Sequence, residues 1–208
     1  NRIIAVTFIG ILTYALEEKS SVKGPTECNK PAMTNFDSSK YLKFIPPYVT
    51  HSKYDSEVTV CRVSTTATTN GTVDTDISGY YHERGVIYHY EDLCRTSEEI
   101  YKQGQFLADC KIVKDTYYKE KEFIPITYKH YLSVVDTDYE NYAILYTCYK
   151  DEETKKIEDD YEVLQMNPTG SEALVKEALT KLDMNLEEFA PKNATNCQNE
   201  NKDKKNDS

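Results

Sequence analysis

The chain has 208 residues and a formal net charge of −10 at pH 7, from 25 Lys and Arg against 35 Asp and Glu. This balance argues against a nucleic-acid-binding surface, which must neutralise phosphates, and against docking on an anionic membrane. With 39% hydrophobic residues, 18 Tyr and no Trp, the chain has enough apolar material for one tyrosine-rich core.

The N-terminus has the pattern of a secretory signal peptide. Arg2 precedes an apolar run over residues 3–16, which is shorter than the roughly 20 residues that span a bilayer. We therefore expect residues 1–16 to be a signal peptide and 17–27 an N-terminal extension. The mature protein is then secreted and extracellular.

The middle of the chain reads as short strands separated by turns. β-branched and aromatic residues gather in runs, and turn signals such as Asn70-Gly71 and the segment from His82 to Gly85 mark hairpins between them. Eight or so strands at this spacing predict an all-β sandwich or an up-and-down barrel. The expected strands cover residues 48–53, 58–69, 72–81, 86–90, 105–113, 123–135, 141–149 and 161–166.

A helix is expected after the last strand. Ser171 is a suitable N-cap, and apolar residues then recur at helical spacing. This single apolar stripe predicts a helix packed on the outside of the barrel. The stripe consists of Leu174, Val175, Ala178, Leu179 and Leu182.

Six cysteines behind a signal peptide predict three disulfides. No short Cys-x-x-Cys spacing supports a zinc site, and spacing alone does not choose the pairing, although Cys94 and Cys110 lie close enough for a local pair within a hairpin. Asn-x-Ser/Thr sequons make Asn70, Asn193 and Asn206 glycosylation candidates.

The usual catalytic motifs are missing. The sequence has no nucleophile elbow, no zinc-protease helix, no P-loop and no dinucleotide fingerprint, and its four His do not fall at helical metal-ligand spacing. We therefore expect no enzyme activity and no cofactor. A closed eight-stranded barrel can instead hold one small ligand.

Several segments, taken in order, resemble a known family. The most telling is Asp136-Thr137-Asp138-Tyr139 leading to Cys148, which is like a lipocalin signature. Over about residues 26–197 the chain resembles the salivary lipocalins of blood-feeding triatomine bugs, the triabin, pallidipin, triplatin and procalin group. The other matching segments are 27–28, 35–41, 48–53, 60–62 and 196–197.

The resemblance implies an eight-stranded up-and-down antiparallel lipocalin barrel with a C-terminal helix over residues 28–191. A polar tail, 192–208, is then tethered at Cys197. The implied disulfides are Cys28–Cys148 and Cys61–Cys197, which leaves Cys94–Cys110. Lipocalins usually place Gly-x-Trp on the first strand, where Trp plugs the barrel base, and here Tyr48 is expected to take that part.

The group's members have different targets, so the fold does not fix the ligand. Arg62, on a strand after Cys61, is the first candidate, because a guanidinium in an apolar pocket recognises a carboxylate. In related proteins the matching Arg is associated with the carboxylate of a thromboxane-like lipid. The alternative is an ordinary solvated Arg. We expect Tyr48, Tyr142, Ile144 and Tyr146 to line the pocket with it.

Three other features of the sequence offer alternative binding sites. An amine-binding pocket needs carboxylates, and Asp136, Asp138 and Glu140 are candidates at a strand end. His82 lies near the position of the haem-ligating His in the distantly related nitrophorins, although it also fits an exposed turn. An acidic outer surface, able to steer towards a basic protein, is formed by Asp151, Glu152, Glu153, Glu158, Asp159 and Asp160.

The sequence therefore predicts a secreted, monomeric ligand-binding protein that interferes with host haemostasis. The favoured mechanism is capture of a small platelet agonist such as a thromboxane-like eicosanoid. The alternative is inhibition of a coagulation or contact-phase protein through the acidic surface, and binding of a biogenic amine or haem comes after these.

Overall fold

The structure, a computed structural model, describes residues 27–54, 59–118, 123–150, 155, 157–195 and 197. The expected signal peptide, the sequon at Asn206 and the acidic residues Asp151, Glu152 and Glu153 lie outside these residues. No helix in the described ranges is long and apolar enough to cross a membrane.

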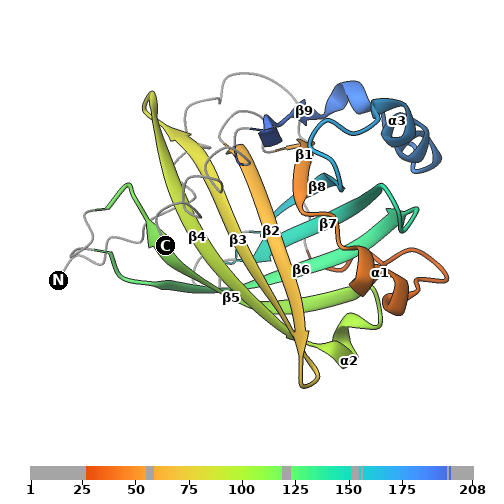
Figure 1. The fold of residues 1–208 in the computed structure, drawn as a ribbon, viewed down its shortest axis with the longest axis horizontal. Helices are drawn as coiled ribbons and strands as arrows, with labels where there is room; N and C mark the ends of the chain where they lie inside the picture. Colours follow the sequence, from red (N-terminus) through yellow and green to blue (C-terminus); the bar gives the residue numbers. More distant parts are fainter. Residues whose placement is uncertain are drawn as a thin grey trace.

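Eight antiparallel strands form a closed barrel, as predicted (Figure 1). Neighbours along the sheet follow chain order from β2 to β8, and β1 then pairs with both β8 and β2 to close it. A two-residue strand, β9 (Ala190–Pro191), adds to β1. The barrel strands are β1 (Tyr48–Ser52), β2 (Thr59–Thr69), β3 (Thr72–Glu83), β4 (Val86–Ser97), β5 (Gln105–Asp115), β6 (Ile126–Thr137), β7 (Tyr142–Lys150) and β8 (Ile157–Gln165).

Two hairpin turns follow directly from their residues. Asn70 and Gly71 have φ of 51° and 77°, and Arg84 and Gly85 have φ of 51° and 79°. Two consecutive positive φ values give the turn whose twist matches antiparallel strands. The β2–β3 and β3–β4 hairpins therefore form where the sequence predicts them.

Two strands extend well beyond their expected bounds. β4 continues to Ser97 through Glu91 and Asp92, and β8 begins at Ile157, before Asp159 and Asp160. Charged residues of this kind usually mark turns, so they shortened the predicted strands. In the structure they belong to the barrel wall.

A helix that the sequence analysis missed covers one end of the barrel. In α1 (Ser38–Phe44), Asp37 caps the helix by accepting a hydrogen bond from the Lys40 N–H. Tyr41 of α1 is 2% exposed, and burial raises its pKa well above the usual range. Tyr41 belongs to a buried apolar cluster at this end of the barrel, called the base cluster below. Its members are Tyr41, Phe44, Val49, Val73, Tyr101, Val134, Ala143, Leu145 and Leu164.

The prediction that Tyr48 plugs the barrel is therefore wrong. Its neighbour Val49 belongs to the base cluster, and successive strand residues point to opposite faces. Tyr48 lies on the outer side of β1, and the ring of Tyr41 fills the base instead.

The C-terminal helix packs on the outside of the barrel, as predicted (Figure 1). In α3 (Glu172–Lys181), the Ser171 hydroxyl accepts from the Leu174 N–H, and Val175, Ala178 and Leu179 are buried. They join an outer cluster with Val135, Tyr142, Ile144, Tyr146, Cys148, Val163 and Phe189. The short helices α2 (Glu98–Tyr101) and η1 (Leu186–Glu188) complete the described elements.

All three implied disulfides are present: Cys28–Cys148, Cys61–Cys197 and Cys94–Cys110. The first two link residues 120 and 136 positions apart, so they tie the chain ends to the barrel. The third joins the neighbouring strands β4 and β5.

Replacing the base plug should be costly. Tyr41→Ala removes a fully buried ring, and we expect the free energy of unfolding to fall by about 3–5 kcal/mol. Urea denaturation measures the change. Leu174→Ala, at a position on α3 that is 40% exposed, is the control and should change it by less than about 0.5 kcal/mol. Equal effects of the two substitutions would contradict the assigned plug.

Candidate ligand-binding site

The base cluster identifies which residues face the barrel interior. Val49, Val73, Val134, Leu145 and Leu164 mark the inward face of five strands, and alternation carries that face towards the other end. Further inward positions are given by the cross-strand pairs. They include Arg62 on β2, Asp92 on β4, Tyr128 and His130 on β6, and Glu162 on β8.

Arg62 lies inside the barrel in an ion pair with Glu162. Their side chains are only 22% and 9% exposed, so the solvated alternative for Arg62 does not hold. The guanidinium charge also acts across the interior: after burial it is the second cause of the lowered pKa of His130, and it partly offsets the rise that burial causes in the pKa of Asp92. Arg62 is therefore part of a polar layer that joins four strands.

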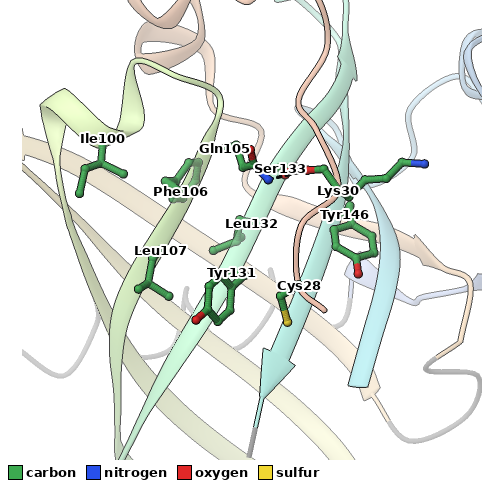
Figure 2. A pocket seen from close by; sticks show the side chains of 10 residues that line it. All are labelled: Cys28, Lys30, Ile100, Gln105, Phe106, Leu107, Tyr131, Leu132, Ser133 and Tyr146. Carbon is green, nitrogen blue, oxygen red and sulfur yellow. Dashed lines mark hydrogen bonds between the residues drawn. The ribbon is translucent and has the colours of Figure 1, made fainter. Parts of the chain in front are cut away.

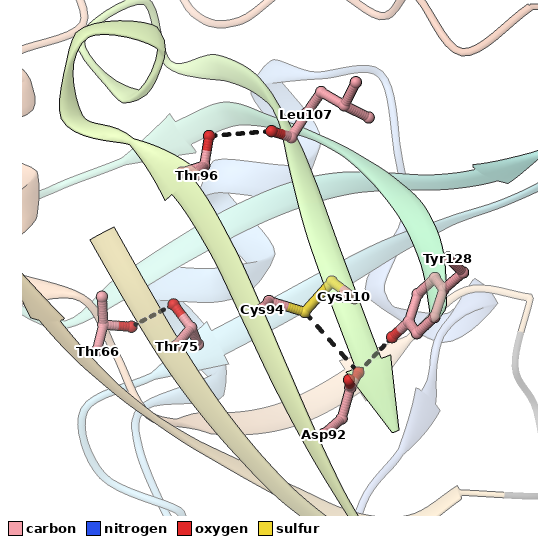
Figure 3. The surroundings of a disulfide bond; sticks show 8 residues. All are labelled: Thr66, Thr75, Asp92, Cys94, Thr96, Leu107, Cys110 and Tyr128. Carbon is pink, nitrogen blue, oxygen red and sulfur yellow. Dashed lines mark hydrogen bonds between the residues drawn. A yellow bond between two sulfur atoms is a disulfide. The ribbon is translucent and has the colours of Figure 1, made fainter. Parts of the chain in front are cut away.

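Asp92 is the second member of this layer (Figure 3). It is 3% exposed, and its Oδ2 accepts a hydrogen bond from the Tyr128 hydroxyl. Burial raises the pKa of Asp92, and this outweighs the Tyr128 hydrogen bond, the Arg62 charge and the nearby backbone N–H groups of Leu93 and Lys111, which lower it. Within the described ranges, Oδ1 of Asp92 has no hydrogen-bond partner.

The disulfide Cys94–Cys110 borders Asp92 on the same inner face (Figure 3). The Cys94 sulfur lies 3.8 Å from Oδ2 of Asp92, and Asp92, Cys94 and Cys110 present atoms within 4.8 Å of one another. Metal ligation by cysteine requires the thiolate, and both sulfurs are held in the disulfide. This cluster is therefore no metal site in its oxidised form.

Towards the open end the interior becomes rich in tyrosine. Asp115 is buried and accepts hydrogen bonds from the Tyr81 hydroxyl at 2.9 and 3.0 Å. Tyr90 lies against Gly79 of the neighbouring strand, where an added Cβ would be 2.6 Å from the Tyr90 ring. Gly79 thus leaves the space that the ring occupies.

The prediction that Tyr142, Ile144 and Tyr146 line the interior is wrong. All three belong to the outer cluster under α3, and the alternate residues Ala143 and Leu145 face inward. The sequence pattern did not decide between the faces, because β7 is buried on both sides from Tyr142 to Cys148.

Tyr146 instead borders a groove on the outside of the barrel (Figure 2). The groove has a volume of about 260 Å³ and lies between the segment containing Cys28 and Lys30 and the strands β5 and β6. The Lys30 carbonyl accepts hydrogen bonds from Gln105 and Ser133, so this segment is held against the wall.

The carboxylates proposed for an amine are also placed elsewhere. Asp138 accepts from the N–H groups of Glu140, Asn141 and Tyr142, and these hydrogen bonds lower its pKa despite partial burial. Asp136 accepts from the Tyr142 hydroxyl at 2.7 Å on the outer face. These groups hold the β6–β7 turn, and Glu140 is exposed.

His82 is exposed next to the β3–β4 turn, so it is not a haem ligand within the barrel. The acidic run on β8 is not one outer patch either. Asp160 is 9% exposed and accepts from the Ser52 hydroxyl and from the N–H groups of Lys53 and Tyr54. Asp159 and Glu158 point to opposite faces of β8.

The sequence analysis missed Asp92, Tyr128, His130 and Glu162. A signal for the last was present, because Glu158, Asp160 and Glu162 recur at every second position. In a strand this period puts all of them on one face. The carboxylates were interpreted as a surface charge run, and only barrel closure turns that face inward.

An eight-stranded antiparallel barrel with an outer C-terminal helix and a partly polar interior defines a lipocalin, a class of ligand-binding proteins. A family model described as Triabin matches residues 17–180. Pallidipin of Meccus pallidipennis is 32% identical over 95% of this chain and 97% of its own length. The chain therefore belongs to the Triabin family, whose members are ligand-binding or inhibitor proteins and not enzymes.

Solved structures agree on the fold. The tryptamine complex of the amine-binding protein of Rhodnius prolixus has a TM-score of 0.59 and 21% identity, covering 79% of this chain and 85% of that one. A complex of LTBP1 with leukotriene C4 has a TM-score of 0.50 and 24% identity, covering 82% and 96%. At these identities the likeness concerns the barrel alone.

The inner histidine should make stability depend on pH. Burial, with the charge of Arg62, lowers the pKa of His130 from 6.5 to about 4. Below pH 6.5 the unfolded chain binds a proton that the folded chain does not, so stability falls between pH 6.5 and about 4. In His130→Gln, urea denaturation across this interval should show a smaller loss. An unchanged slope would contradict the assignment.

The contact between Gly79 and Tyr90 can be tested with a double-mutant cycle. Gly79→Ala should lower the free energy of unfolding by about 1–3 kcal/mol, because the new Cβ overlaps the ring. In a Tyr90→Ala background the same substitution should lower it by less than about 0.5 kcal/mol. Additive effects would show that the ring does not occupy this space.

Proposed function

We propose that this protein is a secreted scavenger that captures a small platelet agonist inside its barrel and so disturbs host haemostasis. The proposed ligand class is a protonated aromatic amine. Secretion is supported by the three disulfides, which persist in oxidising compartments.

The charge balance of the barrel interior carries this proposal. Among the described residues that face inward, Arg62 is the cation, and Glu162 already neutralises it. A buried ammonium ion needs a carboxylate partner, and among the described residues the inward acidic side chains outnumber the inward cation. The inward acidic residues are Asp92, Asp115, Glu158, Asp160 and Glu162.

The tyrosines near the open end suit the same ligand. Tyr81 and Tyr90 have ring centroids 6.1 Å apart, and Tyr81 and Tyr88 are 5.8 Å apart. Aromatic faces attract cations, and they also pack against an aromatic ligand ring. An amine is also what the fold neighbour from Rhodnius prolixus binds, as tryptamine.

A thromboxane-like lipid is the second candidate, because Arg62 lies inside the barrel above the apolar base cluster. A lipid carboxylate would, however, come beside Glu162 and compete with it for the guanidinium. Like charges at close range in a partly buried site repel strongly. This arrangement favours a cationic ligand over an anionic one.

The alternative of an acidic outer surface that inhibits a coagulation protein has less support. Of its described members, Asp160 is buried and Glu158 shares the inward face of β8 with it. The remaining acidic residues of that run do not by themselves define a partner.

Two calorimetric titrations of the disulfide-intact protein test the proposal. Tryptamine should bind one-to-one with a Kd below about 1 μM, which corresponds to about −8 kcal/mol. A stable thromboxane mimic should bind at least about tenfold more weakly. Tight binding of the mimic with no heat from tryptamine would reverse the assignment, and no heat from either would remove small-agonist capture.

A further inference from the structure

Among the described residues, Oδ1 of Asp92 is the one buried side-chain polar atom without a hydrogen-bond partner. Oδ2 of Asp92 accepts a hydrogen bond from the Tyr128 hydroxyl, whereas Oδ1 has no partner among the described residues, and the residue is only 3% exposed. Glu162 is paired with Arg62, and both oxygens of Asp115 accept from Tyr81.

An unsatisfied buried carboxylate oxygen destabilises a folded protein. Arg62 does not remove this cost, since its ion pair is with Glu162 and its charge only partly offsets the burial of Asp92. Among the described residues, folding stability alone would therefore favour an uncharged side chain at position 92. A ligand that donates to Oδ1 would supply the one hydrogen bond that this carboxylate lacks among the described residues.

The surroundings of Asp92 define the shape of that ligand. On one side lies an apolar inner cluster of Cys94, Ala108 and Cys110, with Ile77, Leu132 and the ring of Tyr128 packed against it. A carboxylate beside a compact apolar surface matches a molecule with an ammonium group a short distance from a flat ring.

We propose that Oδ1 of Asp92 accepts a hydrogen bond from the ammonium group of a primary arylalkylamine, whose ring lies against the Cys94–Cys110 disulfide. This inference rests on the proposed function and names the acceptor within it. The specificity follows from the geometry, because the ligand must carry both a positive charge and an N–H donor.

Binding is then linked to the protonation of Asp92. The charged and titratable groups facing it are Arg62 from β2, Tyr128 and His130 from β6, and Glu162 through its pair with Arg62. Burial raises the pKa of Asp92, so a falling pH protonates this carboxylate earlier than an exposed one. Affinity for the amine should fall with falling pH, and Asp92→Asn should abolish this dependence.

Calorimetry with tryptamine on the full disulfide-intact chain tests the acceptor. Asp92→Asn should weaken binding at least tenfold, because the amide keeps the Tyr128 hydrogen bond and loses the charge. The matched control is Asp136→Asn, which alters a carboxylate that also accepts from a tyrosine hydroxyl but lies on the outer face. Its affinity should stay within twofold of the unsubstituted protein.

Thermal unfolding at neutral pH separates a ligand role from a structural one. Because burial disfavours the charged form of Asp92 more than its neighbours favour it, Asp92→Asn should have a melting temperature at least equal to that of the unsubstituted protein. A large drop in melting temperature would indicate that Asp92 is needed for folding and would contradict the inference.

A second probe works without any substitution. N,N,N-trimethyltryptammonium has the same charge and ring as tryptamine but no N–H, and it should bind at least tenfold more weakly. Equal binding of the two would overturn the hydrogen bond to Oδ1, as would full affinity in Asp92→Asn. In both cases the amine-scavenging function would stand, whereas no tryptamine binding to the unsubstituted protein would remove that function itself.

Discussion

Closing the sheet between β8 and β2 is the constraint on which the rest of the structure depends. The strand between them, β1, has only five residues, whereas β2 has eleven. Inside the barrel the Arg62–Glu162 ion pair joins β2 to β8, and outside it the Cys61–Cys197 disulfide ties the C-terminal segment to β2. Arg62 is thus committed to closure, which makes it a poor receptor for a free carboxylate.

Closure also divides every strand into an inner and an outer face. The inner face is apolar at the base, where Tyr41 fills the end, and it becomes polar towards the tyrosine-rich end. An ion pair and tyrosine hydrogen bonds satisfy most of that polarity. Asp92 departs from this pattern, and departures from local satisfaction are concentrated at functional sites in proteins. That is the physical reason to place the ligand there.

The outer face has its own core, and this limited prediction of the site. Because α3 and the Cys28 segment cover β7, its inner and outer residues are equally buried from Tyr142 to Cys148. Hydrophobic alternation, which reveals a half-exposed strand, is then uninformative. The short helix α1 was missed for a related reason, since seven residues carry too little periodicity to be seen beside Pro46 and Pro47.

The sequence by itself determined the strand order, the turns at Asn70-Gly71 and Gly85, the helix capped by Ser171 and the class of protein. These depend on local backbone preferences and on segments that can be compared directly. Tertiary structure alone decided which face of each strand is inside, and so moved Tyr142, Ile144 and Tyr146 to the outer core and Asp92, His130 and Glu162 to the interior. The two-residue period of a strand separates its two faces but does not tell which face is inside. Only closure of the barrel decides that.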